Sequence, residues 1–523
     1  MSFPDPAFLF CFLPITLLLF AVAGRFFGPP GACIALILAT LVFCVPYGWP
    51  FVCVVVVSAL ANHAAFVFLT RQTALEAARL RSCVFMGMVI FNIATLIAVK
   101  YGVLFAGIPG AEPYFAMIAN AIPVTISFFT FQRIVMICDA YQRRPEILAV
   151  AGSDFRSQLR LGAFSMMFPN LVIGPIAYAS EIVGQLGRST FGRIRASDVR
   201  VALTIIAIGF AKKILIADRL DTFVVSPVFS AISAGQKVAP IEAVAGVCGF
   251  YGLLYFDFSG YSDIAIGIAR LFGVELPMNF NSPLRATGIV DFYKRWHITL
   301  TRVIARLLYT PLALIGTRFA LKHRLRGARS RIFTNWLPFL VNFEVIGLWH
   351  GAKWTYVVFG LYHGAWFILE TEIRSTKKWK SYVKRTSGNF RLRMGQVTTF
   401  VPLVLSFALF RSHSLQDFGR LMSNFNGNWL AVVSDPASRI LPYRESVIYL
   451  TVAFATIWLL PNAYEFLRNY QPGIVTWPVP STTPRWTNFA WRPTLLWGVL
   501  ASALAFMVVR SLNAPTPFVY GAF

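Results

Sequence analysis

The sequence has 523 residues, of which 57% are hydrophobic and only 13% are charged. Soluble domains carry about 25% charged residues, so this composition excludes an ordinary soluble protein and indicates a polytopic membrane protein. The formal net charge is +25. Basic loops beside membrane spans account for such an excess, so we expect membrane lipids as partners and no nucleic acid.

Apolar runs near the roughly 20-residue length of a membrane span recur along the whole chain. We expect helices at residues 7–24, 31–49, 50–70, 83–100, 115–131, 161–186, 201–217, 240–256, 301–316, 332–349, 354–371, 397–411, 446–460 and 493–510. Several runs are short or contain Gly and Pro, so we predict about 11 to 14 transmembrane or re-entrant helices. Because backbone groups in hydrocarbon must satisfy their own hydrogen bonds, the predicted fold class is all-α.

The first apolar run, at residues 8–24, has some features of a secretory signal. It has no basic segment, follows Asp5 and contains Pro14, so we expect a retained helix. The seven cysteines are scattered through apolar runs and never form CxxC. This pattern predicts neither disulfides nor a metal site.

Two loops hold much of the positive charge. Six Lys and Arg residues lie between Arg318 and Arg331 and eight between Arg374 and Arg393, with no acidic residue in either stretch. The positive-inside rule places both loops in the cytoplasm of a multi-pass protein, which we assign to the cell inner membrane. Residues 332–373 must then form a helical hairpin. Anionic lipid headgroups and an acidic carrier protein are candidate partners at the inner face.

His350 lies near the turn of that hairpin, in the apolar stretch IGLWHGAKWTYVVFG at residues 346–360. Titratable groups at membrane depth are costly, so each indicates a substrate path, a proton relay or a reaction centre. Trp349 and Trp354 flank His350, and Lys353 is the only charged residue beside it. The two tryptophans either wall a site or are interfacial aromatics at a helix turn.

The densest polar stretch is residues 255–300, where Asp257, Asp263, Asp291 and His297 alternate with aromatic residues. It suits an amphipathic or re-entrant element that lies at the membrane interface or lines a cavity, or equally a cytoplasmic loop with ordinary surface charges. Asp257 and Asp263 are six positions apart and do not share a helix face, so we expect them to pair with nearby arginines or to cap helices.

Four stretches, in order, resemble the membrane-bound O-acyltransferase family, in particular its bacterial branch of alginate O-acetyltransferases and D-alanyl transferases. They are IPVTISFFTFQRIVMICDAY at 122–141, MFPNLVIGPI at 167–176, FDFSGYSDIAIGIARLFGVELPMNFNSPLRATGIVDFYKRWHITL at 256–300 and GLWHGAKWTYVVFGLYHG at 347–364. Weaker matches follow at 409–415, 460–466 and 515–520. The resemblance implies a ring of tilted helices around a thin core. Within one integral domain, 1–523, it divides the chain into N-terminal helices at 1–119, a catalytic core at 120–420 and C-terminal helices at 421–523.

The resemblance also implies the chemistry. His350 corresponds to the family's proposed catalytic histidine and His297 to the second histidine needed for activity. The expected reaction transfers an acyl group, commonly acetyl, from a cytoplasmic thioester to a hydroxyl on an exported polysaccharide. The donor, acetyl-CoA or an acyl carrier protein, is a substrate, so no tightly bound cofactor is expected. A periplasmic acetyltransferase is a candidate partner.

The residues agree with that role. Attack by a sugar hydroxyl on a thioester needs a base near neutral pH, and imidazole, with an ordinary pKa of about 6.5, is the closest match. Trp349, Trp354, Lys353 and Asp263 are the candidate substrate-binding residues. His297 follows Lys294 and Arg295, so we expect cationic surroundings and a supporting role. His363 is expected to be a packed residue.

The chain departs from the branch at two places. Ala305-Arg306-Leu307-Leu308-Tyr309 stands where the branch usually has an Arg-Asp pair before Tyr-Leu-Tyr, and Ala177-Tyr178 stands where it often has an arginine. Alternatives are D-alanyl transfer to a cell-envelope polymer, a secondary transporter, or a scaffold of polysaccharide export. The chain has no Walker A, GxSxG or HExxH motif, which argues against a pump, a serine hydrolase and a metalloprotease.

Overall fold

The computed structural model describes residues 3–71, 78–100, 126–171, 173–427, 429, 439–475, 490–512 and 518. In this part of the chain the regular structure is helical, and the sole β-type pairing is an isolated bridge between Pro277 and Ile474. Seven of the described helical stretches are long and apolar enough to cross a membrane, and the apolar helix Leu495–Arg510 is shorter. The predicted class, an all-α polytopic membrane protein, is confirmed.

The N-terminal part begins with one bent helix. The two spans expected at 7–24 and 31–49 form the continuous stretch Phe8–Tyr47, which contains α1 (Leu13–Cys44). It bends at Gly28, whose φ of +64° is tolerated best by glycine, directly before two prolines. The next helices are α2 (Trp49–Arg71), α3 (Ala78–Lys100) and α5 (Ile126–Tyr141). Most of the span expected at 115–131 lies outside the described residues.

The span expected at 161–186 is not a single helix. This region forms three short helices: α7 (Phe155–Ser165), α8 (Phe168–Leu171) and α9 (Ala179–Leu186). Asp154 caps α7 by accepting a hydrogen bond from the backbone N–H of Ser157. Gly174 and Pro175 lie between α8 and α9, where the backbone is not helical, as expected of these two residue types.

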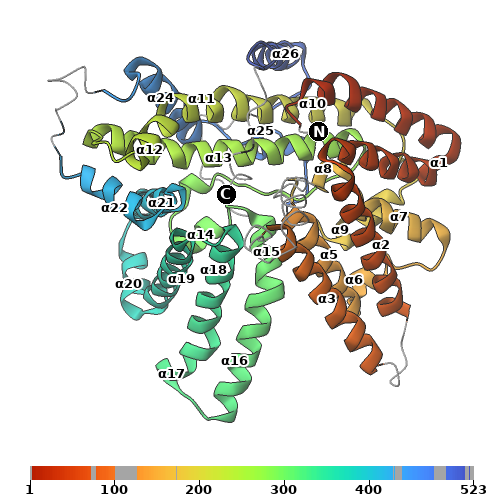
Figure 1. Ribbon diagram of the computed structural model, residues 1–523, viewed down its shortest axis with the longest axis horizontal. Coiled ribbons are helices and arrows are strands. Elements are labelled where there is room, and N and C mark those ends of the chain that lie inside the picture. The colour runs from red at the N-terminus through yellow and green to blue at the C-terminus, as the bar shows by residue number, and fades with distance from the viewer. Residues whose placement is uncertain are drawn as a thin grey trace, which may run out of the picture.

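The longest buried helix, α13 (Pro240–Leu271), crosses the middle of the molecule (Figure 1). Proline occupies its first turn, and Gly273, with φ +74°, follows its end, the usual signals for a helix start and stop. It packs against α10 (Ala196–Phe210), the π-helical turn Ala211–Ala217 and the helices that follow, α11 (Asp218–Leu220) and α12 (Ser226–Ser233).

Two acidic residues of α13 are buried as ion pairs. Lys213 Nζ lies 2.7 Å from Asp257 and 2.8 Å from Asp218, and Lys212 Nζ lies 2.6 Å from Asp263. The expectation that Asp257 and Asp263 are paired is confirmed, but their partners are lysines from a distant segment instead of nearby arginines. These pairs hold the Ala211–Ala217 turn against α13.

Residues 255–300 are almost entirely buried, so they are not a cytoplasmic loop with surface charges. The first part completes α13. The rest is mostly irregular backbone with the short helix α14 (Ile289–Tyr293), and it leads into α15 (Ile298–Ile304). Irregular backbone of this kind needs protein around it in a membrane. The interpretation as an element lining a cavity is therefore supported for residues 272–300.

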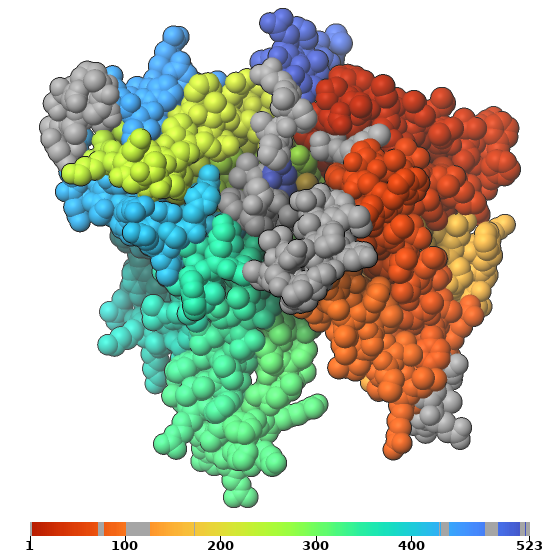
Figure 2. Space-filling view, viewed as in Figure 1, coloured from red at the N-terminus to blue at the C-terminus, as the bar shows by residue number. Residues whose placement is uncertain are grey.

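The hairpin predicted at 332–373 is confirmed. A helical region comprising α16 (Thr310–Lys322), α17 (Gly327–Arg331) and α18 (Leu337–His350) projects from the body, and α19 (Trp354–Ser375) returns beside α18 (Figures 1 and 2). A Cβ at Gly347 would lie 2.4 Å from the carbonyl oxygen of Tyr356, so only glycine allows this approach of the two helices. The turn places His350 at the inner end of α18.

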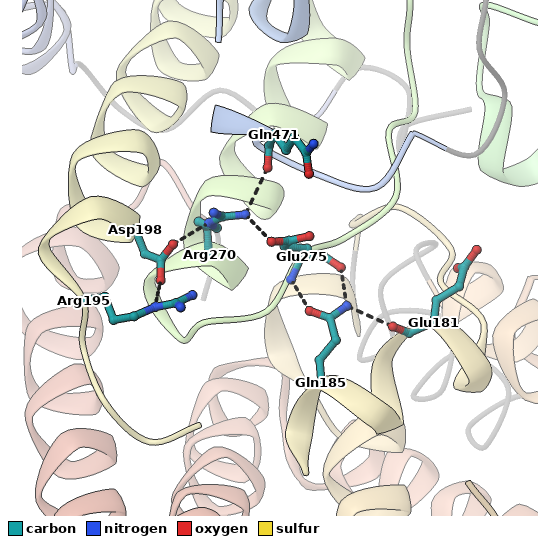
Figure 3. A network of polar contacts seen from close by, with 7 residues as sticks. All are labelled: Glu181, Gln185, Arg195, Asp198, Arg270, Glu275 and Gln471. Atoms are coloured by element: carbon teal, nitrogen blue, oxygen red, sulfur yellow. Dashed lines mark hydrogen bonds and ion pairs between the residues drawn. The ribbon is translucent and has the colours of Figure 1, made fainter. Parts of the chain in front are cut away.

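The chain continues through α20 (Lys377–Arg385), α21 (Gly388–Arg411), α22 (Leu415–Asn424), α24 (Tyr443–Leu459), α25 (Ala463–Phe466) and α26 (Leu495–Arg510). The proline-rich loop expected at 477–484 lies outside the described residues. A polar network near the end of α13 joins α9, α10 and the segment before α26 (Figure 3). In it, Arg270 binds Asp198 at 2.9 Å, Glu275 at 2.7 Å and the carbonyl oxygen of Gln471 at 3.0 Å.

Candidate active site

His297 occupies a strained position at the start of α15. Its φ of +44° and ψ of +51° place it in the left-handed region, which only a few per cent of residues other than glycine adopt, although Asn, Asp and His adopt it more often than the rest. The side chain is buried, with 2% of its surface exposed. Such strain costs of order 1–3 kcal/mol and is concentrated at functional sites, which makes this residue a candidate independently of the sequence.

Asn279 fixes which nitrogen of His297 carries the proton. Its Oδ1 lies 3.1 Å from His297 Nδ1 and also accepts from the backbone N–H of Thr299 at 3.3 Å and from Thr299 Oγ1 at 2.8 Å. A backbone N–H can only donate, so this atom of the amide is the oxygen, and His297 Nδ1 must donate to it. In a neutral ring the remaining nitrogen, Nε2, is then the acceptor.

The ring of His297 lies among aromatic side chains. Its centroid is 4.7 Å from that of Phe258 and 5.9 Å from that of Phe128. The expectation of cationic surroundings is wrong. Arg295 turns away to bind Asp291 at 2.8 Å, because the left-handed turn at His297 separates its side chain from those that precede it.

His350 is the last residue of α18 and is 7% exposed. Its ring meets Phe410 of α21 edge-on at 4.8 Å and lies 6.1 Å from the ring of Tyr356. Packing from α18, α19 and α21 therefore holds the imidazole, and the apolar context predicted from the sequence is present around it.

The two histidines line one cavity. Its volume is about 30 Å³, which is enough for water-sized groups. The lining residues come from α14, α15, α18, α19, α21 and the residues between α14 and α15: Tyr293, Trp296, His297, Leu300, Thr301, Ile346, His350, Phe359, Phe407 and Phe410. The fold thus joins two residues that are 53 positions apart, and their chemical roles stay predictions.

Tyr293 adds a hydroxyl to this cavity that the sequence did not single out. Its Oη lies 2.9 Å from Nδ1 of His363, which is fully buried. The His363 ring packs against Phe359 with centroids 4.2 Å apart, so the expectation that His363 is a packed residue is confirmed. Tyr293 thus connects the cavity wall to a buried imidazole.

Lys100 is a second residue that sequence reasoning missed. At the end of α3, its ammonium donates to the carbonyl oxygen of Trp349 and lies 4.9 Å from the centroid of the Trp349 ring. Trp349 in turn lies beside His350, with ring centroids 4.6 Å apart. The cation that contacts Trp349 is thus Lys100, while Lys353 is exposed and lies over Tyr356 at 5.7 Å. A lone charge at the end of an apolar run was the available signal for Lys100.

The other candidate substrate-binding residues lie apart from the ring of His350. Trp354 is 74% exposed, which fits an interfacial aromatic better than a wall of the site. Asp263 is held in its ion pair with Lys212 on α13. Trp349 is the one tryptophan of the flanking pair that packs next to the histidine.

The two departures from the bacterial branch meet in space. The guanidinium of Arg306 lies 5.0 Å from the centroid of the Tyr178 ring and forms an ion pair with Asp139. The guanidinium carbon of Arg302 lies 4.2 Å from the centroid of the same ring, and its two terminal nitrogens donate to the Glu181 carboxylate at 2.8 and 3.2 Å. The two substitutions therefore form one contact between α9 and the region after α15.

Among the described residues, no group of three or more His, Cys, Asp or Glu side chains is placed to hold a metal ion. The cavity offers two imidazoles, a tyrosine and aromatic walls. Such a set can accept and return a proton while it excludes water.

Comparison with known proteins agrees with this geometry. Residues 125–393 match the family model described as MBOAT, membrane-bound O-acyltransferase family. A peptidoglycan O-acetyltransferase of Helicobacter pylori is 29% identical over 481 residues, 87% of this chain and 86% of that protein. A probable alginate O-acetylase of Pseudomonas fluorescens is 29% identical over 90% of this chain and 83% of its own length. A teichoic acid D-alanyltransferase of Lacticaseibacillus rhamnosus is 31% identical over 42% of this chain and 54% of its own length.

Proposed function

The chain belongs to the membrane-bound O-acyltransferase family and is an acyltransferase, and from this premise we propose that it O-acetylates an exported glycan of the cell envelope. The acyl group comes from a thioester on the cytoplasmic side, acetyl-CoA or an acyl carrier protein. The observation that carries the proposal is the single cavity lined by both His297 and His350. Because the chain belongs to an acyltransferase family, we no longer propose a transporter or a scaffold.

The proposed reaction uses His350 as the base. The oxygen of a sugar hydroxyl attacks the thioester carbonyl carbon, a C–O bond forms, and the hydroxyl proton passes to His350. The C–S bond then breaks, and the proton returns to the leaving sulfur to give a free thiol. A correctly placed general base contributes roughly 10²- to 10⁴-fold to such a step.

The geometry narrows the role of His297. With Nδ1 donating to Asn279, a neutral ring has only an acceptor at Nε2. It therefore suits orienting the sugar hydroxyl or sharing its proton better than donating to the carbonyl oxygen. Tyr293, which lines the same cavity, is a candidate donor to that oxygen if His363 Nδ1 carries the ring proton and donates to the Tyr293 hydroxyl, because the single phenol proton is then free.

O-acetyl transfer is favoured over D-alanyl transfer. The two O-acetyl relatives align with 87% and 90% of this chain, whereas the D-alanyltransferase aligns with 42%. Glycans named for those relatives, peptidoglycan and alginate, are the acceptor classes to examine first. A periplasmic acetyltransferase remains part of the proposal as a partner.

The test is mass spectrometry of envelope glycans from cells with and without the protein. We expect an acetyl ester that is present with the protein and absent without it. The position of the missing ester identifies the acceptor. A D-alanyl ester that disappears instead would favour the alternative, and unchanged glycans would contradict the proposal.

A further inference from the structure

A second, larger cavity of about 600 Å³ lies outside the histidine site. Its walls are α19 and α21, and α20 covers it, with the backbone at Thr287 and Gly288 completing the lining. The proposed reaction uses none of these residues, and no role has been assigned to them so far.

α20 is strongly amphipathic and turns its apolar face to this cavity. Trp379, Tyr382 and Val383, spaced three and one positions apart, line it, while the lysines of α20 are exposed. Thr376 caps the helix by accepting from the backbone N–H of Trp379 at 3.1 Å. A short helix with this pattern, aromatic on one face and Lys-rich on the other, is typical of segments that lie at a membrane interface.

The cavity lining carries two arginines and one carboxylate, that of Glu370. Arg374 is committed to the protein, because it binds Glu370 at 2.9 Å and donates to the carbonyl oxygen of Thr287 at 3.1 Å. Arg391 also lines the cavity, and in the described part of the chain it has no carboxylate within ion-pair distance. Lys377, Lys378, Lys380 and Lys384 are exposed on α20 and do not line the cavity, so they add only to the positive charge near it. An anionic group would complete this arrangement.

Part of the cavity wall is apolar and exposed at the protein surface. Leu369 is 58% exposed, Met394 42% and Leu392 38%, and α21 is one of the helices long enough to span a bilayer. The cavity therefore joins a basic rim to an apolar surface that continues along membrane helices. Its complement is a molecule with an anionic head and hydrocarbon chains.

We propose that this cavity binds an anionic phospholipid, with its phosphate at Arg391 and its acyl chains along Leu369 and Met394. Arg391 selects the headgroup, and basic pockets between membrane helices are known to favour such lipids. The apolar wall favours a lipid over the thioester donor. Lipid acyl chains can pack against this wall, whereas the hydrophilic part of the donor cannot. The bound lipid would fix α20 against the hairpin that carries His350.

The experiment offers purified full-length protein an equal mixture of phosphatidylglycerol and phosphatidylcholine with identical chains and counts the retained lipids by native mass spectrometry. One basic residue near a membrane surface contributes a preference of roughly fivefold for an anionic lipid. We expect the wild-type protein to retain phosphatidylglycerol preferentially and Arg391→Gln to lose about fivefold of that preference. Arg393→Gln is the matched control, because Arg393 is exposed on the same helix and does not line the cavity.

A steric variant distinguishes binding inside the cavity from non-specific attraction of lipids by the basic loop. Thr398 is an exposed lining residue, and Thr398→Trp should expel the lipid while every charge stays in place. Retention of both lipids in equal amounts by the wild type would overturn the proposal. So would normal phosphatidylglycerol retention in Arg391→Gln and Thr398→Trp, or displacement of the lipid by free coenzyme A, which would assign the cavity to the donor. Glycan acetylation need not be measured, so this test is independent of the proposed function.

Discussion

Asn279 Oδ1 accepts a hydrogen bond from His297 Nδ1 at 3.1 Å, and the same oxygen receives the backbone N–H of Thr299. The amide thus fixes both the position and the tautomer of an imidazole at the start of α15. A single side chain, 18 positions before the histidine, decides which ring nitrogen can accept a proton.

The first prediction concerns this amide. Asn279→Ala should lower the acetylation rate by roughly 10- to 100-fold, because the His297 ring loses its orientation and tautomer. Asn279→Asp keeps an acceptor at the same place and should retain more activity than the alanine variant. Initial rates with purified protein check this, and equal rates for the two variants would contradict it.

A second prediction concerns Tyr293. Removing its hydroxyl in Tyr293→Phe leaves Nδ1 of His363 without this buried partner, which should cost about 1–3 kcal/mol of unfolding free energy. Acetylation should fall further than stability explains if the hydroxyl also serves the cavity. A double-mutant cycle with His363→Phe separates the two effects, since a purely structural pair would couple in stability and leave the rate of folded enzyme unchanged.

The flanking tryptophans should behave differently from each other. Trp349 packs beside His350, whereas Trp354 is 74% exposed. We expect Trp349→Ala to reduce activity by about tenfold or more, on the scale of a misplaced catalytic group. Trp354→Ala should change activity by less than about twofold, as for a surface substitution. Comparable losses in both variants, at equal protein levels, would restore Trp354 as a wall of the site.

The fourth prediction concerns the buried ion pairs behind α13. Lys213 is fully buried between Asp257 and Asp218, so Lys213→Met leaves uncompensated negative charge and should cost about 3–5 kcal/mol of unfolding free energy. Arg420→Ala removes a largely exposed pair with Asp417 and should cost at most about 1 kcal/mol. Thermal unfolding of both variants in detergent provides the measurement, and equal shifts would show that the Lys213 pair is not a major support of the fold.

The sequence predicted what depends on local composition. Long apolar runs predicted the helices and the hairpin. His350 was singled out because a titratable side chain is costly in such a run. The prediction failed at 161–186, where Gly174 and Pro175 interrupt an apolar stretch that otherwise has the length of a span.

The partners of the site residues depend on the fold and were missed. Asn279 reaches His297 from 18 positions away, and nothing local marks it. Lys100 reaches Trp349 from 249 positions away, and its one local signal is a charge at the end of an apolar run. The surroundings of His297 were also missed. Its backbone is left-handed, and its ring lies among aromatic residues instead of beside the neighbouring arginine. The tryptophans differ because Trp349 is the penultimate residue of α18 and Trp354 is the first residue of α19, on opposite sides of a turn.

The most direct test of the central claim is the O-acetyl content of envelope glycans in cells that carry His350→Gln in place of the native residue. Glutamine keeps a polar side chain of similar size but cannot act as a base near neutral pH. With His350→Gln protein present in the membrane at the wild-type level, we expect the acetyl ester to fall by roughly 10²-fold or more. Acetylation at the wild-type level in that variant would contradict the assignment of His350 as the catalytic base.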